Sequence, residues 1–178
     1  MNTKANQKFR QTHKEIMDAV MILLKNKNIK QITVAEICRM VGINRSTFYE
    51  HFLDTYDVIE TIAQTISDEA IKVVPKEKPD KENFILMCNH IKEYKEFYSL
   101  FFKQDLPISV QNKFFLSSPP PIPDELKKER RISTDIQLEY HCVLFQAGMD
   151  AITKKWLSRD CKETPDELYD ILQLVYHI

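Results

Sequence analysis

The stretch that decides the fold runs from Ile32 to Phe52 and reads I-T-V-A-E-I-C-R-M-V-G-I-N-R-S-T-F-Y-E-H-F. Thr33 is a predicted N-cap, and Glu36 three residues later completes a reciprocal capping box. Gly42 ends the helix that begins there, because glycine adopts the left-handed C-terminal conformation without steric cost. Asn44 is a candidate cap for a second short helix. The stretch therefore predicts two short helices joined by a tight turn, a helix-turn-helix.

The side chains of this stretch divide into a packing set and an outward set. Ala35 is small at a point where two helices must approach closely. The apolar residues expected to fix the two helices are Ile37, Val41, Ile43, Phe48 and Phe52. The outward residues of the second helix are mostly hydrogen-bond donors: Arg45, Ser46, Thr47, Tyr49 and His51. A helix that lies in the major groove of DNA needs such a face, although each residue taken singly also fits a solvated helix surface.

The segment Lys8–Ile66, about a third of the chain, resembles the N-terminal DNA-binding domain of TetR-type transcriptional regulators, most specifically in its Thr-Phe-Tyr-x-His-Phe ending. The resemblance implies that Thr33, Tyr49 and His51 contact backbone phosphates. It also implies that the residues closest to the bases are Asn44, Arg45, Ser46 and Thr47. The family usually has a lysine where this chain has Thr55, so we expect one phosphate contact to be weakened or replaced.

The C-terminal part is similar to one TetR subgroup, which includes regulators of dihydroxyacetone kinase operons. The similarity lies in His90–Phe102 and in Tyr140–Tyr176, with the pattern F-Q-A-G-M-D-A-I-x-K-K-W-L. It implies that the last two helices pack against those of a second subunit as a four-helix bundle. The candidate dimer interface comprises Ala147, Gly148, Ala151, Leu168, Ile171, Leu172 and Val175. The alternative for these residues is an intramolecular core.

An aromatic group in the same part of the chain is a candidate effector pocket. Its members are Tyr94, Phe97, Tyr98, Phe101 and Tyr140. Aromatic residues at helical spacing also fill hydrophobic cores, and core filling is the alternative here.

Composition supports an all-α fold. The chain has 178 residues but only two glycines, Gly42 and Gly148. These two glycines are too far apart to form a phosphate-binding loop of the G-x-G-x-x-G or G-x-x-x-x-G-K type. The shortage of glycine also argues against a meander of tight hairpins, since its turns need many residues with positive φ. Charge is uneven: residues 1–55 carry a net +4 and the remaining residues a net −5. This asymmetry fits a head that binds a polyanion, and chance asymmetry is the alternative.

Apolar residues at helical spacing predict the other helices. The predicted helices span residues 8–27, 34–41, 45–52, 55–73, 84–103, 133–158 and 165–177, with Phe9 on the apolar face of the first. The last opens with Thr164, Pro165 and Glu167, a capping box with proline at the first helical position. The proline-containing segment 107–123 is predicted to be a loop. We expect a DNA-binding domain at 1–55, a connecting helix at 55–73, and a helical effector-binding and dimerisation domain at 74–178.

The remaining features point away from catalysis and metals. The four cysteines are widely spaced and are expected to be free, buried thiols, which with the polar N-terminus fits a soluble cytoplasmic protein. His90 near Cys88 and His141 beside Cys142 lack the spacing of a metal site, and no cofactor is expected.

The sequence thus predicts a homodimeric DNA-binding regulator, not an enzyme. We expect a repressor that binds a palindromic double-stranded operator, is released by a small-molecule effector and does not enter a membrane. One alternative is a co-regulator whose C-terminal domain binds a protein partner. The other is an enzyme or ligand-binding protein with an incidental helix-turn-helix.

Overall fold

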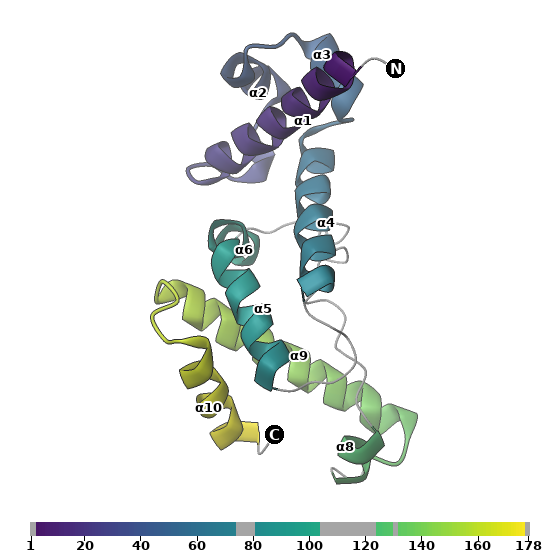
Figure 1. The fold of residues 1–178 in the computed structure, drawn as a ribbon, viewed down its shortest axis with the longest axis vertical. Coiled ribbons are helices and arrows are strands. Elements are labelled where there is room, and N and C mark those ends of the chain that lie inside the picture. Colours follow the sequence, from purple (N-terminus) through teal and green to yellow (C-terminus); the bar gives the residue numbers. More distant parts are fainter. Residues whose placement is uncertain (1–2, 74–80, 104–123, 130–131, 177–178) are drawn as a thin grey trace. The chain divides into compact units, whose positions relative to one another are not determined.

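The computed structural model describes residues 3–73, 81–103, 124–129 and 132–176 (Figure 1). Every regular element in these ranges is a helix, so the predicted all-α fold is confirmed. The elements are α1 (Thr3–Leu24), the 3-10 turn η1 (Ile29–Gln31), α2 (Val34–Val41), α3 (Arg45–His51), α4 (Thr55–Val73), α5 (Lys81–Glu93), α6 (Lys95–Lys103), α8 (Asp124–Glu129), α9 (Asp135–Ser158) and α10 (Pro165–Tyr176). The predicted loop at 107–123 lies outside the described residues.

The chain divides into two compact units. The first holds the described residues up to Thr65 together with Lys103, and the second holds Ile66–Phe102 and the described residues from Asp124 onward. Among the described residues, no helix is long and apolar enough to cross a membrane.

The first unit is built on α1, α2 and α3, which are grouped together in Figure 1. α1 packs against α2, and α2 packs against α3. The centre of the core is formed by side chains without solvent exposure, among them Ile16, Val20, Ile37 and Phe48.

The predicted apolar face of α4 is confirmed, because all six of its residues are buried: Val58, Ile59, Ile62, Ala63, Ile66 and Ala70.

Two sequence expectations about the helices were wrong. The sequence places Phe9 on the apolar face of the first helix, yet its side chain is 49% exposed. The predicted helix 84–103 is interrupted at Tyr94, between α5 and α6. The Tyr94 amide still donates to the His90 carbonyl at 3.1 Å, and the Tyr98 amide donates to the Tyr94 carbonyl at 3.1 Å. A one-residue interruption leaves the aromatic spacing intact, so periodicity could not reveal it.

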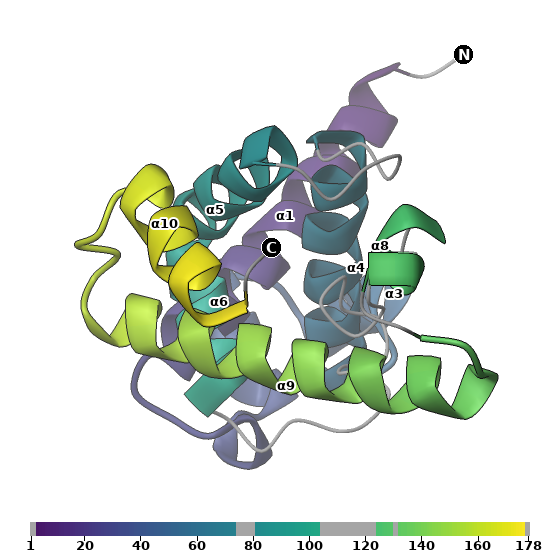
Figure 2. The same cartoon turned by 90° about the horizontal axis from the view of Figure 1, so that it is seen from below.

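In the second unit, α5 packs against α10, and Figure 2 shows these two helices side by side. Phe84 and Tyr169 pack across this contact with ring centroids 5.5 Å apart. Lys81 forms an ion pair with Asp166 at 2.8 Å. These contacts hold the C-terminal helix against the chain's own α5.

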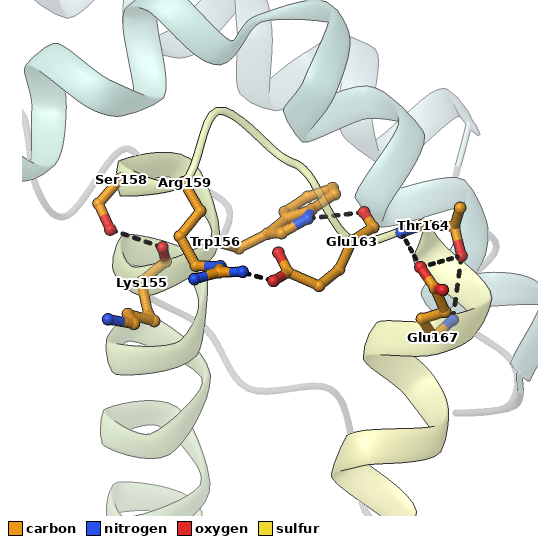
Figure 3. A network of polar contacts seen from close by, with 7 residues as sticks. All are labelled: Lys155, Trp156, Ser158, Arg159, Glu163, Thr164 and Glu167. Carbon is orange, nitrogen blue, oxygen red and sulfur yellow. Dashed lines mark hydrogen bonds and ion pairs between the residues drawn. The ribbon is translucent and has the colours of Figure 1, made fainter.

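The turn from α9 to α10 is held by a polar network (Figure 3). The indole Nε1 of Trp156 donates to the Glu163 carbonyl at 2.9 Å, and Arg159 pairs with the Glu163 carboxylate at 2.6 Å. The predicted capping box of α10 is confirmed, because the Glu167 amide donates to Thr164 Oγ1 at 3.2 Å and the Thr164 amide donates to Glu167 at 2.8 Å. The network fixes the angle between the two helices, which are the candidates for dimer formation.

Candidate nucleic-acid interface

The turn between α2 and α3 has the geometry that the sequence predicts. Gly42 ends α2 with φ 76° and ψ 31°, in the left-handed region. Asn44 caps α3, because its Oδ1 accepts the Thr47 amide at 2.8 Å. The same oxygen accepts the Ser46 hydroxyl at 2.6 Å. The cap therefore fixes two of the side chains expected nearest the bases and leaves the Asn44 amide nitrogen for other partners.

The capping box predicted for α2 forms only in part. The Glu36 amide donates to Thr33 Oγ1 at 3.3 Å, as expected. The Glu36 carboxylate, however, accepts Lys27 Nζ at 2.6 Å instead of returning to the Thr33 amide. An opposite charge within reach makes the stronger hydrogen bond. Glu36 consequently ties α2 to the segment that follows α1, while the exposed Thr33 keeps a hydroxyl proton to donate.

The outward face of α3 is accessible at its N-terminal end. Asn44, Arg45, Ser46 and Tyr49 are exposed, while Thr47 is half-buried. Glu50 is the only acidic residue of α3, and it is also exposed. The N-terminal part of the face thus presents neutral donors and one guanidinium to solvent, and the carboxylate of Glu50 lies near its end. Such groups can bind phosphate oxygens and base edges.

His51, the last residue of α3, is held by aromatic contacts with α1. Its ring stacks on Phe9 with centroids 4.0 Å apart. The His51 Nδ1 atom is buried and has no hydrogen-bond partner in the described structure. Burial lowers the pKa of His51 below its ordinary value, and nearby Glu50 opposes that effect. The lowered pKa favours the neutral form of His51, which can donate a hydrogen bond without carrying a charge.

His13 of α1 completes this group. Its ring stacks on Phe52 with centroids 4.3 Å apart and lies 5.7 Å from the His51 ring. Burial lowers the pKa of His13, and His51 lowers it further, whereas Asp57 raises it. Sequence reasoning missed the contribution of Phe9 and His13. Their spacing of four residues places them on one helix face, but it does not say what that face touches.

The start of α4 is capped by the chain's own residues, and its first side chain is buried. Thr55 is only 7% exposed. The helix is capped by Asp54, whose Oδ1 accepts the Asp57 amide at 2.9 Å. The Leu53 amide in turn donates to the Asp57 carboxylate at 2.8 Å. Thr55, the position at which the resemblance implies a lysine, is thus a small buried side chain.

The candidate effector residues lie in different surroundings. Phe97 and Tyr98 are buried in the second unit, Phe101 is half-buried, and Tyr140 is exposed on α9. The Tyr94 hydroxyl donates to the Glu69 carboxylate. His90, which the sequence does not assign to the candidate effector pocket, is buried beside Tyr94 with ring centroids 4.9 Å apart.

The candidate dimer residues also divide. Ala147, Ala151 and Ile171 are exposed, and Gly148 is half-buried. Leu168 and Leu172 are buried within the chain, and the Val175 side chain lies outside the described residues. α9 also carries three exposed large apolar residues that the sequence did not assign to the interface: Ile136, Val143 and Leu144.

The cysteines are free thiols, three of them buried and Cys142 half-buried. In the part of the chain that the structure describes, no group of three or more His, Cys, Asp or Glu side chains could hold a metal ion.

Comparison with known proteins identifies the class of this protein. The family model for the transcriptional regulator C-terminal region of the TetR type matches residues 81–177, more than half of the chain. The protein is therefore a transcriptional regulator. Within that class, the chain belongs to the TetR family. Members of this family are generally regulators and not enzymes.

Solved structures share the fold along nearly the whole chain. A TetR transcriptional regulator from Streptococcus agalactiae has a TM-score of 0.67 and 18% identity, with 94% of each chain covered. The fatty acid degradation regulator FadR from Bacillus halodurans has a TM-score of 0.62 and 18% identity, with 92% of this chain and 93% of the other covered. The dihydroxyacetone kinase operon activator DhaS has a TM-score of 0.52 and 20% identity, with the same coverage. No curated protein matches the sequence.

Proposed function

We propose that this TetR-family regulator binds a palindromic double-stranded DNA operator as a homodimer, through the N-terminal end of α3 in each subunit. The observation that carries the proposal is the capped turn, in which Gly42 and Asn44 hold an exposed row of donors on α3. In this arrangement Asn44, Arg45, Ser46 and Thr47 read base edges. Phosphate contacts come from Thr33, Tyr49 and His51, which fix the orientation of the helix on the duplex.

Arg45 is the side chain best suited to read a base. It is exposed at the first position of α3, and the N-terminal residues of a recognition helix lie nearest the base edges. A guanidinium donates two parallel hydrogen bonds to guanine from a rigid planar fork, whereas an ammonium is a point charge without that fixed geometry. Arg45 is therefore the proposed specificity residue.

An exposed apolar stripe on α9 supports the homodimer. Tyr140, Leu144, Ala147 and Ala151 follow one another at spacings of three or four residues, and all four are exposed. This spacing places them on one face of the helix. A C2 dimer would bury the same face of both subunits, with α9 as the main element and Ile171 of α10 beside it.

We further propose that a small-molecule effector binds the second unit near the aromatic side chains of α6 and releases a repressor from its operator in the cytoplasm. The support is the combination of Phe97, Tyr98 and Phe101 with polar groups, including the Tyr94–Glu69 hydrogen bond. A protein partner is the alternative ligand. A thermal-shift screen with metabolites, compared with a pull-down, separates these two candidates.

The test of DNA binding compares two substitutions at one position on a duplex that the wild-type protein selects from a random pool. Arg45→Ala should lose about 1–3 kcal/mol of discrimination against a changed guanine. Arg45→Lys keeps the charge but not the bidentate fork, so it should retain affinity for unrelated DNA and still lose discrimination. Unchanged selectivity in both variants would contradict the assignment of Arg45.

A further inference from the structure

The last turn of α3 is held by two side chains of α1 that are not part of the helix-turn-helix. Phe9 stacks on His51 with centroids 4.0 Å apart and ring planes inclined by 30°. One helical turn further along, His13 stacks on Phe52 at 4.3 Å and an inclination of 20°. The two contacts run side by side, since Phe9 and His13 also face each other at 6.3 Å.

Phe9 contributes little to the core of the unit. It is 49% exposed, as is Ile22 near the C-terminal end of the same helix. Its nearest ring neighbour is His51, and that contact covers one side of the imidazole. An aromatic ring that stays half in solvent and stacks on one polar side chain is suited to orient that side chain.

The stack also determines which edge of His51 can act. The Nδ1 atom is buried and has no partner in the described structure. A neutral imidazole carries one N–H, and a buried N–H without a partner costs free energy. The tautomer with the proton on Nε2 avoids burying that donor and keeps it available to a ligand. Phosphate oxygen is an acceptor of the required kind.

We propose that Phe9 and His13 are positioning residues for DNA binding, which hold the His51 ring so that its Nε2–H meets a backbone phosphate. This inference rests on the proposed function and extends it to α1. Phe9 covers the face of the ring, and His13 fixes the neighbouring Phe52, so the last turn of α3 cannot rotate away from α1.

The first test is a double-mutant cycle on a short random-sequence duplex, because phosphate contacts do not depend on sequence. Phe9→Ala should weaken binding by about threefold to tenfold for each subunit that contacts the duplex, the range for one hydrogen bond. In the His51→Ala background the same change should have no further effect, since the two residues act as one unit. Phe9→Tyr keeps the ring and should bind like wild type. Ile22→Ala, a change at an equally exposed apolar residue of α1, is the matched control and should also bind normally.

A second readout follows the His51 imidazole by NMR in the free protein. Phe9→Ala should raise the pKa of His51 toward its ordinary value, because the ring loses its cover, whereas Ile22→Ala should not. The charged or titratable groups around the two imidazoles are Glu50 and Asp57, and neither is changed in these variants.

The outcomes separate the inference from the proposed function. The inference is overturned if wild type binds DNA and Phe9→Ala binds equally well. It is also overturned if Phe9→Ala causes the same loss of affinity in the His51→Ala background as in wild type, because Phe9 then does not act through His51. If wild type binds neither random nor selected duplexes, the proposed function fails first, and this inference fails with it.

Discussion

Replacing Leu144 with aspartate should separate the dimer while leaving each subunit folded. Leu144 is 67% exposed on the apolar stripe of α9, so the subunit's own core does not depend on it. Complete burial of a leucine contributes about 1.5–3 kcal/mol. Burying the exposed two thirds would contribute about 1–2 kcal/mol per subunit and about 2–4 kcal/mol in a symmetric pair. Losing that burial weakens association by about 30-fold to 900-fold, and an aspartate at the interface adds a desolvation penalty.

Sedimentation velocity across a concentration series measures this change. The matched control is Leu53→Asp, which makes the same substitution at a leucine of the first unit that is 81% exposed. Wild type and Leu53→Asp should be dimers at micromolar concentration, and Leu144→Asp should be a monomer with an unchanged melting temperature at low protein concentration. If Leu144→Asp remained as dimeric as Leu53→Asp, α9 would not be the dimer interface.

Three further predictions concern the first unit. Gly42→Ala should lower the free energy of unfolding of this unit by about 1 kcal/mol, as measured by denaturant titration. The φ angle is 76° there and an added Cβ meets nothing within 4 Å, so only backbone strain contributes. A loss near zero would mean that the turn relaxes. The pKa values of His13 and His51 are lowered in the folded protein, so the unfolded state binds more protons. The free energy of unfolding should therefore fall as the pH drops below their ordinary value of 6.5. A melting temperature that stays constant down to about pH 5 would contradict this prediction. Tyr49→Phe should weaken binding to all duplexes equally, and a loss confined to the selected duplex would mean that the hydroxyl reads a base.

Local sequence signals predicted the part of the fold that depends on near neighbours. Gly42 and Asn44 specify their own backbone conformations and caps, and both form as expected. The apolar face of α4 was also predictable, because burial follows a period that can be read from the chain. Interactions within about four residues are visible in a sequence whenever the residue types are specific for them.

Contacts between elements were not predictable in the same way. Glu36 had two competing partners, and the ion pair with Lys27 was decided by where the segment after α1 lies. Phe9 matched the apolar period of α1 but sits near its beginning, where the ring meets His51 instead of the core. The candidate effector residues illustrate the same limit, since Phe97 and Tyr98 of α6 are buried while Tyr140 of α9 is exposed.

The most direct test of the account is selection of duplexes from a random DNA pool by the wild-type protein, followed by sequencing. A dimer that reads DNA through α3 should enrich an inverted repeat, with half-sites separated by about one helical turn or a multiple of it. The Arg45→Ala variant should lose that enrichment at one position in each half-site. Recovery of sequences without any inverted repeat, or no retention of DNA at low salt, would contradict the account.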